Sequence, residues 1–234
     1  MDCNHGSSDS DRFYGEFYER VNWTKGIGAF AVRGMHRKME KEYSNGHFET
    51  CLELGGGSGQ HLDYVLHGFN SYVLVDLREA QLPPKWASDP RIRSVTGDAE
   101  NIPFDDEYFD RVIITCLLHH VDNPEKVLQE VDRVLKIGGV ATIFLPCDPG
   151  LLVRLTRRLT TQRLAKKLGF PDYKLYLARE HKNHVASIVR LAQHTFRNRK
   201  PKFEWSPLPF QTWNLNAFLI IRIGKSTKSQ KSIK

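Results

Sequence analysis

Three glycines in the segment CLELGGGSGQH (51–61) have the spacing of a ligand-binding loop. Gly55, Gly57 and Gly59 directly follow an apolar run and precede a helical pattern. Glycine allows positive φ angles, and a ligand can approach its backbone closely because it carries no Cβ atom. In folds built from parallel strands, ligands bind in the crevice at the carboxyl ends of the strands. The segment therefore predicts a binding site at that edge of a sheet.

An acidic residue, Asp76, ends the next apolar run, about 21 positions after Gly55. A carboxylate at this place can accept hydrogen bonds from both hydroxyls of a ribose. The dinucleotide fingerprint G-x-G-x-x-G would need a glycine at position 60, where the chain has Gln60. Glu53 also stands where that fingerprint has an apolar strand end. The spacing E-x-G-x-G-x-G therefore disfavours a dinucleotide.

The elements that must position these residues form a regular alternation from residue 50 onward. The short runs are rich in Val, Ile and Leu, and several of them lack apolar–polar alternation, as strands buried on both faces do. The segment Pro124–Ile137 predicts a helix with one apolar stripe, a cap at Asp122 or Asn123, and an end at Gly138–Gly139. Strands that alternate with helices indicate an α/β fold with a doubly wound parallel sheet. The predicted strands are Thr50–Leu54, Ser71–Asp76, Ile92–Thr96, Arg111–Thr115 and Val140–Leu145.

The pattern changes after Pro146. Leu151–Leu168 and Leu177–Phe196 have the composition of basic helices. Lys202–Trp205 and Asn216–Ile223 have the composition of strands, and they can close the sheet as an antiparallel hairpin. The sheet is therefore expected to be mixed.

Taken together, these motifs resemble the class I S-adenosylmethionine-dependent methyltransferases, and most closely their small-molecule group. The resemblance covers roughly residues 49–147, and five weak motifs in the right order give it its strength. It implies a Rossmann-like, seven-stranded sheet of order 3-2-1-4-5-7-6 with helices on both faces and an N-terminal helical lid. The motifs are the loop from Glu53 to Gly59, Val75-Asp76-Leu77, GDAENIPF (97–104), the block from Phe109 to His120, and EVDRVLKIGG (130–139).

The resemblance also implies which residues hold S-adenosylmethionine as the cofactor. The glycine loop would lie along the methionine and the ribose, and Glu53 would orient the loop or the amino group. Asp98 would accept from the adenine amino group, and carbonyls near Thr115–Leu117 would hold the cofactor's amino group. Two tyrosines of the lid become candidates near the sulfonium. The predicted cofactor residues are Glu53, Gly55, Gly57, Gly59, Asp76, Leu77, Asp98, Ala99, Cys116, Tyr14 and Tyr18.

Several histidines are candidates for the base that an oxygen acceptor needs near neutral pH. His120, which with His119 follows the fourth predicted strand, is the first candidate, and His181 is the second. His181 and His184 have an i, i+3 spacing on a predicted basic helix, but no third metal ligand is evident, so no metal is expected. A packing role for His119–His120 and a solvated face for the other pair remain the alternatives.

The charge of the chain is divided unevenly, and this bears on the acceptor. Residues 1–146 hold 15 basic and 23 acidic side chains, whereas residues 147–234 hold 19 basic and 4 acidic ones. A solvated basic face is one interpretation. The other is a small or medium-sized anionic acceptor, such as a sugar phosphate or a nucleotide-linked or lipid-linked saccharide, or contact of 151–202 with an anionic membrane surface. Methylation of oxygen is favoured over nitrogen.

Two other functions stay open. RNA is the main alternative acceptor, because basic patches bind phosphates. However, CLLHH (116–120) stands where base-amino methyltransferases have Asn/Asp-Pro-Pro-Tyr/Phe, so nucleic acid is not expected. The second alternative is a non-catalytic, methyltransferase-like binding scaffold.

The 234 residues suffice for one domain with its own core, and 40% hydrophobic with 26% charged residues excludes a wholly disordered chain. We expect an N-terminal helical segment or lid at 1–45, a methyltransferase domain at 46–224 with an acceptor-side insertion at about 148–200, and a basic tail at 225–234. Four cysteines without paired spacing, no secretory signal and no apolar run of about 18 residues predict a cytoplasmic protein with reduced thiols.

Overall fold

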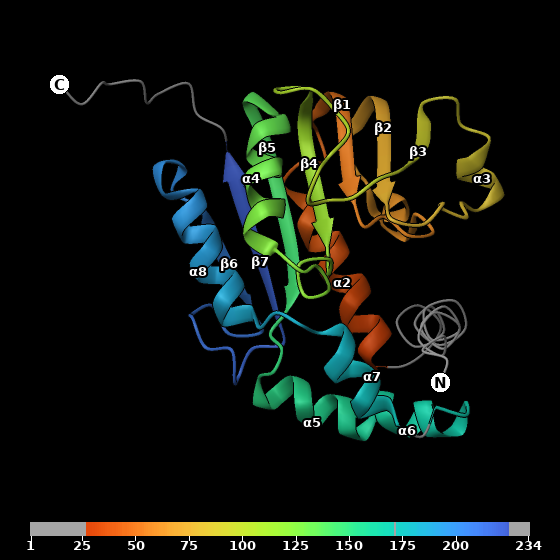
Figure 1. Ribbon diagram of the computed structural model, residues 1–234, viewed down its shortest axis with the longest axis vertical. Helices are drawn as coiled ribbons and strands as arrows, with labels where there is room; N and C mark the ends of the chain where they lie inside the picture. Colours follow the sequence, from red (N-terminus) through yellow and green to blue (C-terminus); the bar gives the residue numbers. More distant parts are fainter. Residues whose placement is uncertain (1–26, 171, 225–234) are drawn as a thin grey trace, which may run out of the picture.

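A seven-stranded sheet forms the centre of the protein (Figure 1). The computed structural model describes residues 27–170 and 172–224. The strand order is β3-β2-β1-β4-β5-β7-β6; the pairs from β3 to β5 are parallel, and β7 is antiparallel to both of its neighbours. This confirms the predicted order and the mixed edge. The strands are β1 (His47–Leu54), β2 (Gly68–Asp76), β3 (Ile92–Thr96), β4 (Phe109–Thr115), β5 (Leu135–Pro146), β6 (Lys202–Ser206) and β7 (Phe218–Gly224).

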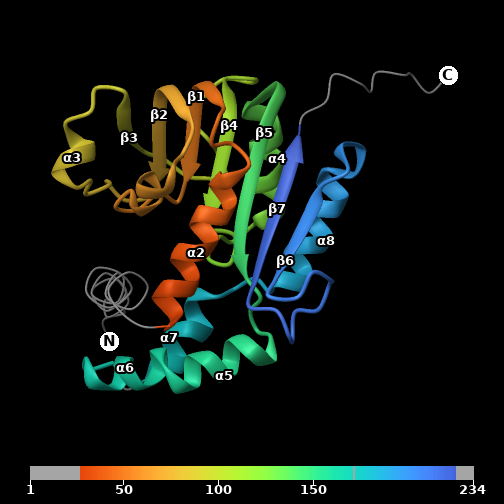
Figure 2. The same ribbon diagram turned by 180° about the vertical axis from the view of Figure 1, so that it is seen from behind.

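Helices cover both faces of this sheet, as expected. Helices α4 and α8 lie on the face seen in Figure 1, and α2 lies on the face seen in Figure 2. Alternate residues of a strand serve the two cores: Leu52 packs toward one cluster and Cys51 toward the other. The helices are α2 (Ile27–Lys41), η3 (Gln60–Tyr64), α3 (Pro84–Ala87), α4 (Pro124–Val134), α5 (Leu151–Leu159), α6 (Thr161–Lys167), α7 (Tyr173–Glu180), α8 (Val185–Thr195) and η4 (Arg197–Arg199).

Helix α4 begins as predicted but ends earlier. The Asn123 side chain accepts a hydrogen bond from the Lys126 amide at 3.0 Å and caps the first turn. The helix ends at Val134, because the fully buried Leu135 is already extended and pairs with Phe109. The prediction of a helix to Ile137, ended by Gly138–Gly139, was therefore wrong by about one turn, since β5 uses those residues.

The helix predicted after the glycine loop is only the short 3₁₀ helix η3. Residues 55–67 must hold both the glycine loop and any helix before β2 starts at Gly68, which leaves no room for a longer one. The region of 151–196 is also more divided than predicted. Thr160, with φ −116° and ψ −80°, separates α5 from α6.

The predicted helix Leu177–Phe196 is broken at residues 181–184. The carbonyl of His119 accepts hydrogen bonds from the amides of Lys182 at 2.8 Å and Asn183 at 3.2 Å. The Asn183 side chain donates to the carbonyl of Val121 at 2.7 Å, so this turn is joined to the loop after β4. His181 and His184 therefore do not share a helix face: the first ends α7 and the second precedes α8.

Some expectations fall outside the described residues. Tyr14, Tyr18, most of the proposed lid at 1–45 and the tail at 225–234 belong to this part; α2 is the described portion of the N-terminal segment. In the ranges 27–170 and 172–224, no helix combines the length and apolar character needed to cross a bilayer. Those ranges also contain no group of three His, Cys, Asp or Glu side chains suited to hold a metal ion.

Candidate functional site

The site lies where the strand order reverses, between β1 and β4. The chain leaves β1 to one side of the sheet and β4 to the other, which opens a crevice at the carboxyl ends in sheets of this kind. The carboxyl ends of β1, β2, β4 and β5 meet at the lower edge of the sheet in Figure 1. The residues that follow these four strands therefore supply the candidate groups.

The glycine loop after β1 uses the backbone freedom that the sequence indicated. Gly55, Gly57 and Gly59 have φ angles of 69°, 50° and 73°. A Cβ atom at Gly59 would stand 2.7 Å from Leu82 Cδ2, so a side chain there would displace Leu82 and would also have to adopt a positive φ angle. A Cβ atom at the exposed Gly57 would meet nothing within 4 Å among the described residues. The loop thus turns one backbone segment toward open space, where a ligand can approach it.

Asp76, at the end of β2, is fixed beside this loop. Its Oδ2 atom accepts a hydrogen bond from the Gly57 amide at 3.1 Å, and its Oδ1 atom accepts from the Arg78 amide at 3.1 Å. An ionised carboxylate has about four acceptor positions, so both oxygens can still accept from ribose hydroxyls. Leu77, the next residue, exposes 71% of its surface beside this carboxylate.

The loop after β3 exposes Asp98, buries the side chain of Ala99 in the core, and is firmly held. Asp98 is exposed, and its Oδ1 atom accepts from the Glu100 amide at 2.8 Å. A pair on α4 fixes the following residues: Glu130 accepts from the Ile102 amide at 2.9 Å, and Arg133 donates to the Ile102 carbonyl at 2.9 Å. The sequence analysis assigned this pair no role, although its i, i+3 spacing within EVDRVLKIGG could have indicated one.

Glu53 lies deeper than the other candidates. It is 1% exposed, and Tyr72 donates its hydroxyl proton to Glu53 Oε2 at 2.7 Å. Burial raises the pKa of Glu53, although the nearby His61 and the Tyr72 hydrogen bond act in the opposite direction. A carboxyl at this depth can orient the glycine loop from beneath it.

Cys116, directly after β4, has a strained backbone. Its φ angle is 56°, which is uncommon for a residue with a side chain, and its amide donates to the Phe144 carbonyl at 2.9 Å. Burial raises the pKa of the Cys116 thiol to about 12, so the thiol stays protonated at neutral pH. Such strain persists only where the surroundings fix the backbone, and here it directs the chain around the end of β4.

A second group of polar side chains follows β4 and β5, which we call the Asp148 cluster: Asp148, His181, His119, His120 and Arg157. His181 Nδ1 donates to Asp148 Oδ2 at 2.6 Å, and Arg157 Nη1 lies 2.8 Å from Asp148 Oδ1. Burial raises the pKa of Asp148, but the His181 hydrogen bond and the Arg157 charge outweigh it and hold that pKa well below its usual range. With Nδ1 directed at this carboxylate, Nε2 of His181 is the atom that can accept a proton.

The two neighbouring histidines differ from His181. His120 donates from Nδ1 to the Glu180 carbonyl at 3.0 Å, and burial, together with the His181 charge, lowers its pKa to about 4. His119 donates from Nε2 to the Pro146 carbonyl at 3.1 Å, and burial lowers its pKa to about 3. Both rings are therefore neutral at physiological pH and are weaker bases than an ordinary histidine.

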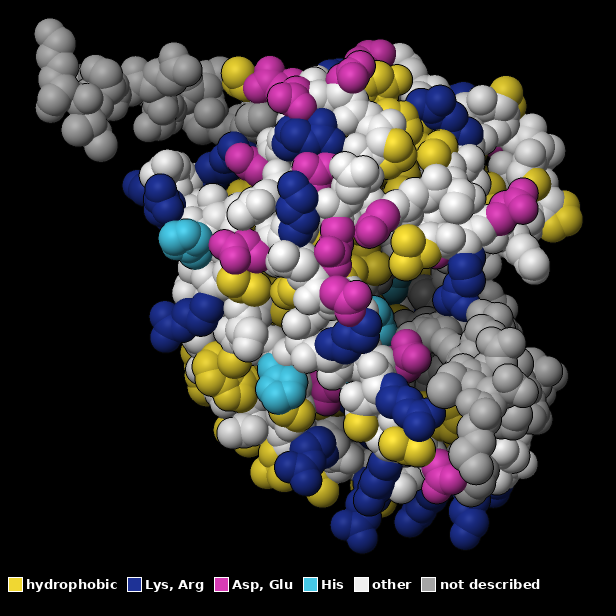
Figure 3. Space-filling view, viewed as in Figure 1, with side chains coloured by type: hydrophobic (Ala, Val, Ile, Leu, Met, Phe, Trp, Pro, Cys, Tyr) yellow, Lys and Arg dark blue, Asp and Glu magenta, His cyan; other side chains and the backbone are white. Residues whose placement is uncertain are grey.

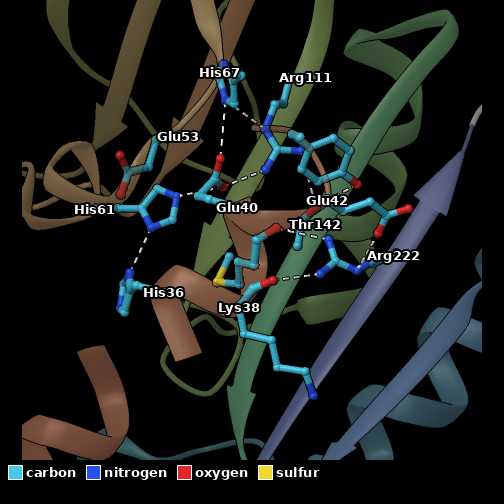
Figure 4. A network of polar contacts seen from close by, with 12 residues as sticks. His36, Lys38, Glu40, Glu42, Glu53, His61, His67, Arg111, Thr142 and Arg222 are labelled. Atoms are coloured by element: carbon cyan, nitrogen blue, oxygen red, sulfur yellow. Dashed lines mark hydrogen bonds and ion pairs between the residues drawn. The ribbon is translucent and has the colours of Figure 1, made fainter. Parts of the chain in front are cut away.

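Sequence reasoning missed Asp148 and a buried network on the α2 face, which we call the Glu40 cluster: Glu40, His36, His61, His67 and Arg111 (Figure 4). Arg111 donates to Glu40 Oε1 at 2.6 Å, and His61 donates to the same oxygen at 3.1 Å. These residues come from three separate elements and from the loop before β2, so no local spacing could reveal them. Asp148 had a signal, since it stands two residues after β5 at the predicted edge.

Comparison with known proteins agrees with this geometry. Residues 52–143 match the family model described as a methyltransferase domain. Demethylmenaquinone methyltransferase of Clavibacter sepedonicus is 37% identical over 94 residues, which cover 39% of this chain and 38% of that protein. The chloroplastic 2-methyl-6-phytyl-1,4-hydroquinone methyltransferase of Spinacia oleracea is 27% identical over 146 residues, covering 59% and 40%. The chain thus spans about two fifths of the length of these curated relatives.

Among solved structures, an S-adenosylmethionine-dependent methyltransferase of Archaeoglobus fulgidus is similar over 91% of this chain and 100% of that chain. The TM-score is 0.61 and the sequence identity is 16%. At this identity the likeness shows the fold, which the two proteins share over nearly their whole length.

Proposed function

We propose that this chain is a class I S-adenosylmethionine-dependent methyltransferase and that it transfers a methyl group to an oxygen of a small-molecule acceptor. One observation carries the proposal. The open glycine loop, the Asp76 carboxylate and the Asp98 loop stand together at the carboxyl edge of the sheet. Residues 52–143, which match the methyltransferase domain model, contain all three.

The residues at this edge fit S-adenosylmethionine. Gly57 leaves space for the ligand, Asp76 has acceptor positions for the ribose hydroxyls, and Asp98 is exposed to accept from the adenine amino group. Leu77 offers an apolar surface beside them. When bound, S-adenosylmethionine supplies an electrophilic methyl group on a sulfonium. The chain itself must bind and orient the two reactants, and orientation alone can supply about 7–11 kcal/mol of the barrier.

We assign the acceptor base to His181 rather than to His120, the first candidate from the sequence. His181 stands at the end of α7, is partly exposed, and is held by the ionised Asp148, which follows β5 by two residues. A carboxylate on Nδ1 fixes the ring and stabilises the protonated form that appears when Nε2 takes the acceptor proton. His120 instead has a pKa of about 4, which suits a packing role in the turn after β4.

The acceptor class has support from two sides. Two of the relatives are named as methyltransferases of demethylmenaquinone and of 2-methyl-6-phytyl-1,4-hydroquinone. We propose for this chain a small-molecule acceptor with a hydroxyl or phenol group, as a hydroquinone has. A narrower proposal is an anionic acceptor, which the 19 basic against 4 acidic side chains of residues 147–234 support.

Incubation with methyl-labelled S-adenosylmethionine tests this function. The acceptor panel contains a short-chain hydroquinone, a simple phenol, a sugar phosphate and a short RNA. We expect label on an oxygen of a small molecule, with one S-adenosylhomocysteine formed for each methyl transferred. Transfer to RNA alone would contradict the proposal, and so would donor binding with no transfer to the panel or to an extract of the native organism.

A further inference from the structure

Helix α5 has an outward face that combines leucines with arginines. Leu151, Leu155 and Leu159 are spaced at i, i+4 and i+8, so they form one row along the helix. Each exposes about half of its surface, at 50%, 48% and 58%. Arg154 and Arg158 are also exposed and lie beside this row, whereas the opposite side of the helix buries Val153. The outward face of α5 is therefore both apolar and basic, whereas a core helix turns its apolar side chains inward.

The loop between β6 and β7 extends this surface. Its exposed apolar side chains are Phe210, Trp213 and Leu215. Asn214 joins the loop to the start of α5: its carbonyl accepts from the Leu152 amide at 2.9 Å, and its side chain accepts from the Leu151 amide at 3.3 Å. The apolar side chains of the loop and the leucine row thus belong to adjoining elements.

A buried asparagine gives this loop a fixed shape. Asn216 is fully buried; its Oδ1 atom accepts from the Leu208 amide at 2.7 Å, and its Nδ2 atom donates to the Phe210 carbonyl at 2.9 Å. The backbone is therefore held in place while its large apolar side chains remain exposed. Exposed patches of this kind mark surfaces that meet a partner.

The charge around the patch has one sign. Residues 151–180 contain eight Lys and Arg side chains against two acidic ones. Seven of the eight are exposed, and the eighth, Arg157, pairs with Asp148. Figure 3 shows lysines and arginines projecting together with apolar side chains along the lower edge, which α5 and α6 form in Figure 1.

We infer that α5 and the 207–217 loop form a docking surface for an anionic lipid bilayer. A helix with basic and apolar residues on its outward face lies in the headgroup region, where leucine and tryptophan side chains enter the acyl boundary and Lys and Arg attract anionic lipids. RNA would leave the leucine row unused, and an uncharged protein surface would leave the seven exposed Lys and Arg side chains without a counter-charge. The bilayer uses both features.

This surface adjoins the proposed acceptor site. Helix α5 carries the leucine row on one side and Arg157, which contacts Asp148, on another. Docking would therefore bring the edge that holds His181 to the membrane surface, where a lipid acceptor is found. The docking surface does not depend on the proposed reaction, because vesicle binding is measured without donor or acceptor.

Vesicle cosedimentation with the full chain tests the inference. The probes are phosphatidylcholine vesicles with and without phosphatidylglycerol, at low and high salt. We expect binding to the anionic vesicles, weakened by salt. Leu155→Ser should weaken it about tenfold or more, because it removes one inserted apolar side chain. Arg158→Gln should weaken it about fivefold and reduce the salt dependence.

The control is Leu66→Ser, which changes a leucine of similar exposure, 51%, outside α5 and the loop. It should bind vesicles like the unchanged protein, and circular dichroism should show that all three variants are folded. Absence of binding to anionic vesicles would overturn the inference. So would equal binding by Leu155→Ser and the unchanged protein, or a vesicle-free dimer that Leu155→Ser dissociates. Labelled methyl transfer, measured separately, would show whether the proposed function stands.

Discussion

The protein contains two histidine-rich clusters around a carboxylate, and they differ in what surrounds them. In the Glu40 cluster, the side chains of Glu40, Arg111, His61 and His67 are all fully buried. In the Asp148 cluster, Asp148 and His181 keep 10% and 15% of their side-chain surface exposed. Both carboxylates have lowered pKa values. The difference in exposure separates a cluster that holds elements together from one that can meet a substrate.

The Glu40 cluster joins three elements on one side of the sheet. Glu40 and His36 come from α2, His61 from η3 directly after the glycine loop, and Arg111 from β4. The two Nδ1 atoms of His36 and His61 are 2.7 Å apart, and the Arg111 guanidinium also stacks over the Tyr43 ring at 3.8 Å. A buried charge with this many partners anchors α2 and η3 to the sheet, and thereby supports the glycine loop.

The largest effect is expected from His181→Gln, which removes the proposed base. It should lower kcat by about 10²–10⁴-fold, because this is the usual contribution of a positioned general base. Affinity for S-adenosylhomocysteine and the free energy of unfolding should change little. Asp148→Asn should lower kcat by a smaller factor, since it leaves the base in place.

The control for His181→Gln is His184→Gln, which changes an exposed histidine three residues further along the chain. It should keep the rate of the unchanged protein. Equal rates for His181→Gln and His184→Gln would show that the Asp148 cluster does not supply the base.

Glu40→Gln, in contrast to His181→Gln, should lower the stability of the protein. It leaves the Arg111 charge buried without a counter-charge, which costs about 3–5 kcal/mol in the free energy of unfolding. Urea unfolding measures this. Glu204→Gln changes a partly exposed partner of Arg222 and should cost no more than about 1 kcal/mol. If the two variants were equally stable, the Glu40 cluster would not be the anchor described above.

Lowering the pH should remove part of the stability that ionised Glu40 contributes. Burial raises the pKa of Glu40, but the His61 hydrogen bond and the Arg111 charge lower it from 4.5 to about 2. Because the folded pKa is the lower one, the stabilisation is present above about pH 4.5 and is lost as the pH falls toward 2. The difference in unfolding free energy between the unchanged protein and Glu40→Gln should therefore shrink by about 3 kcal/mol over this range. A constant difference from pH 7 to pH 2 would contradict the lowered pKa.

Much of the fold could be predicted because its signals are local. The apolar runs identified all seven strands, and the glycine loop and Asp76 identified the edge for which we propose ligand binding. The errors arose where tertiary contacts determine the secondary structure. Leu135 prefers a strand because β4 offers it a backbone partner, and the 181–184 turn exists because the His119 carbonyl receives two amide protons.

The candidate site could likewise be predicted where its signals are local, and not where tertiary contacts determine it. Glu53, Asp76 and Asp98 belong to short motifs with fixed spacing, so the sequence could name them as cofactor candidates. The partner of His181 could not be named, because Asp148 lies 33 residues away. The distinction between His120 and His181 also required their tertiary partners, the Glu180 carbonyl and the Asp148 carboxylate, which a spacing does not contain.

Calorimetric titration with S-adenosylhomocysteine tests the central claim, that the glycine loop and Asp76 hold the methyl donor. The unchanged protein should bind it, and Asp76→Ala should weaken binding by about 10²-fold or more, because it removes charge-assisted hydrogen bonds to the ribose. Asp89→Ala, which changes another aspartate in a turn, should bind like the unchanged protein. Absence of binding to the unchanged protein, or equal affinity in Asp76→Ala and Asp89→Ala, would contradict the account.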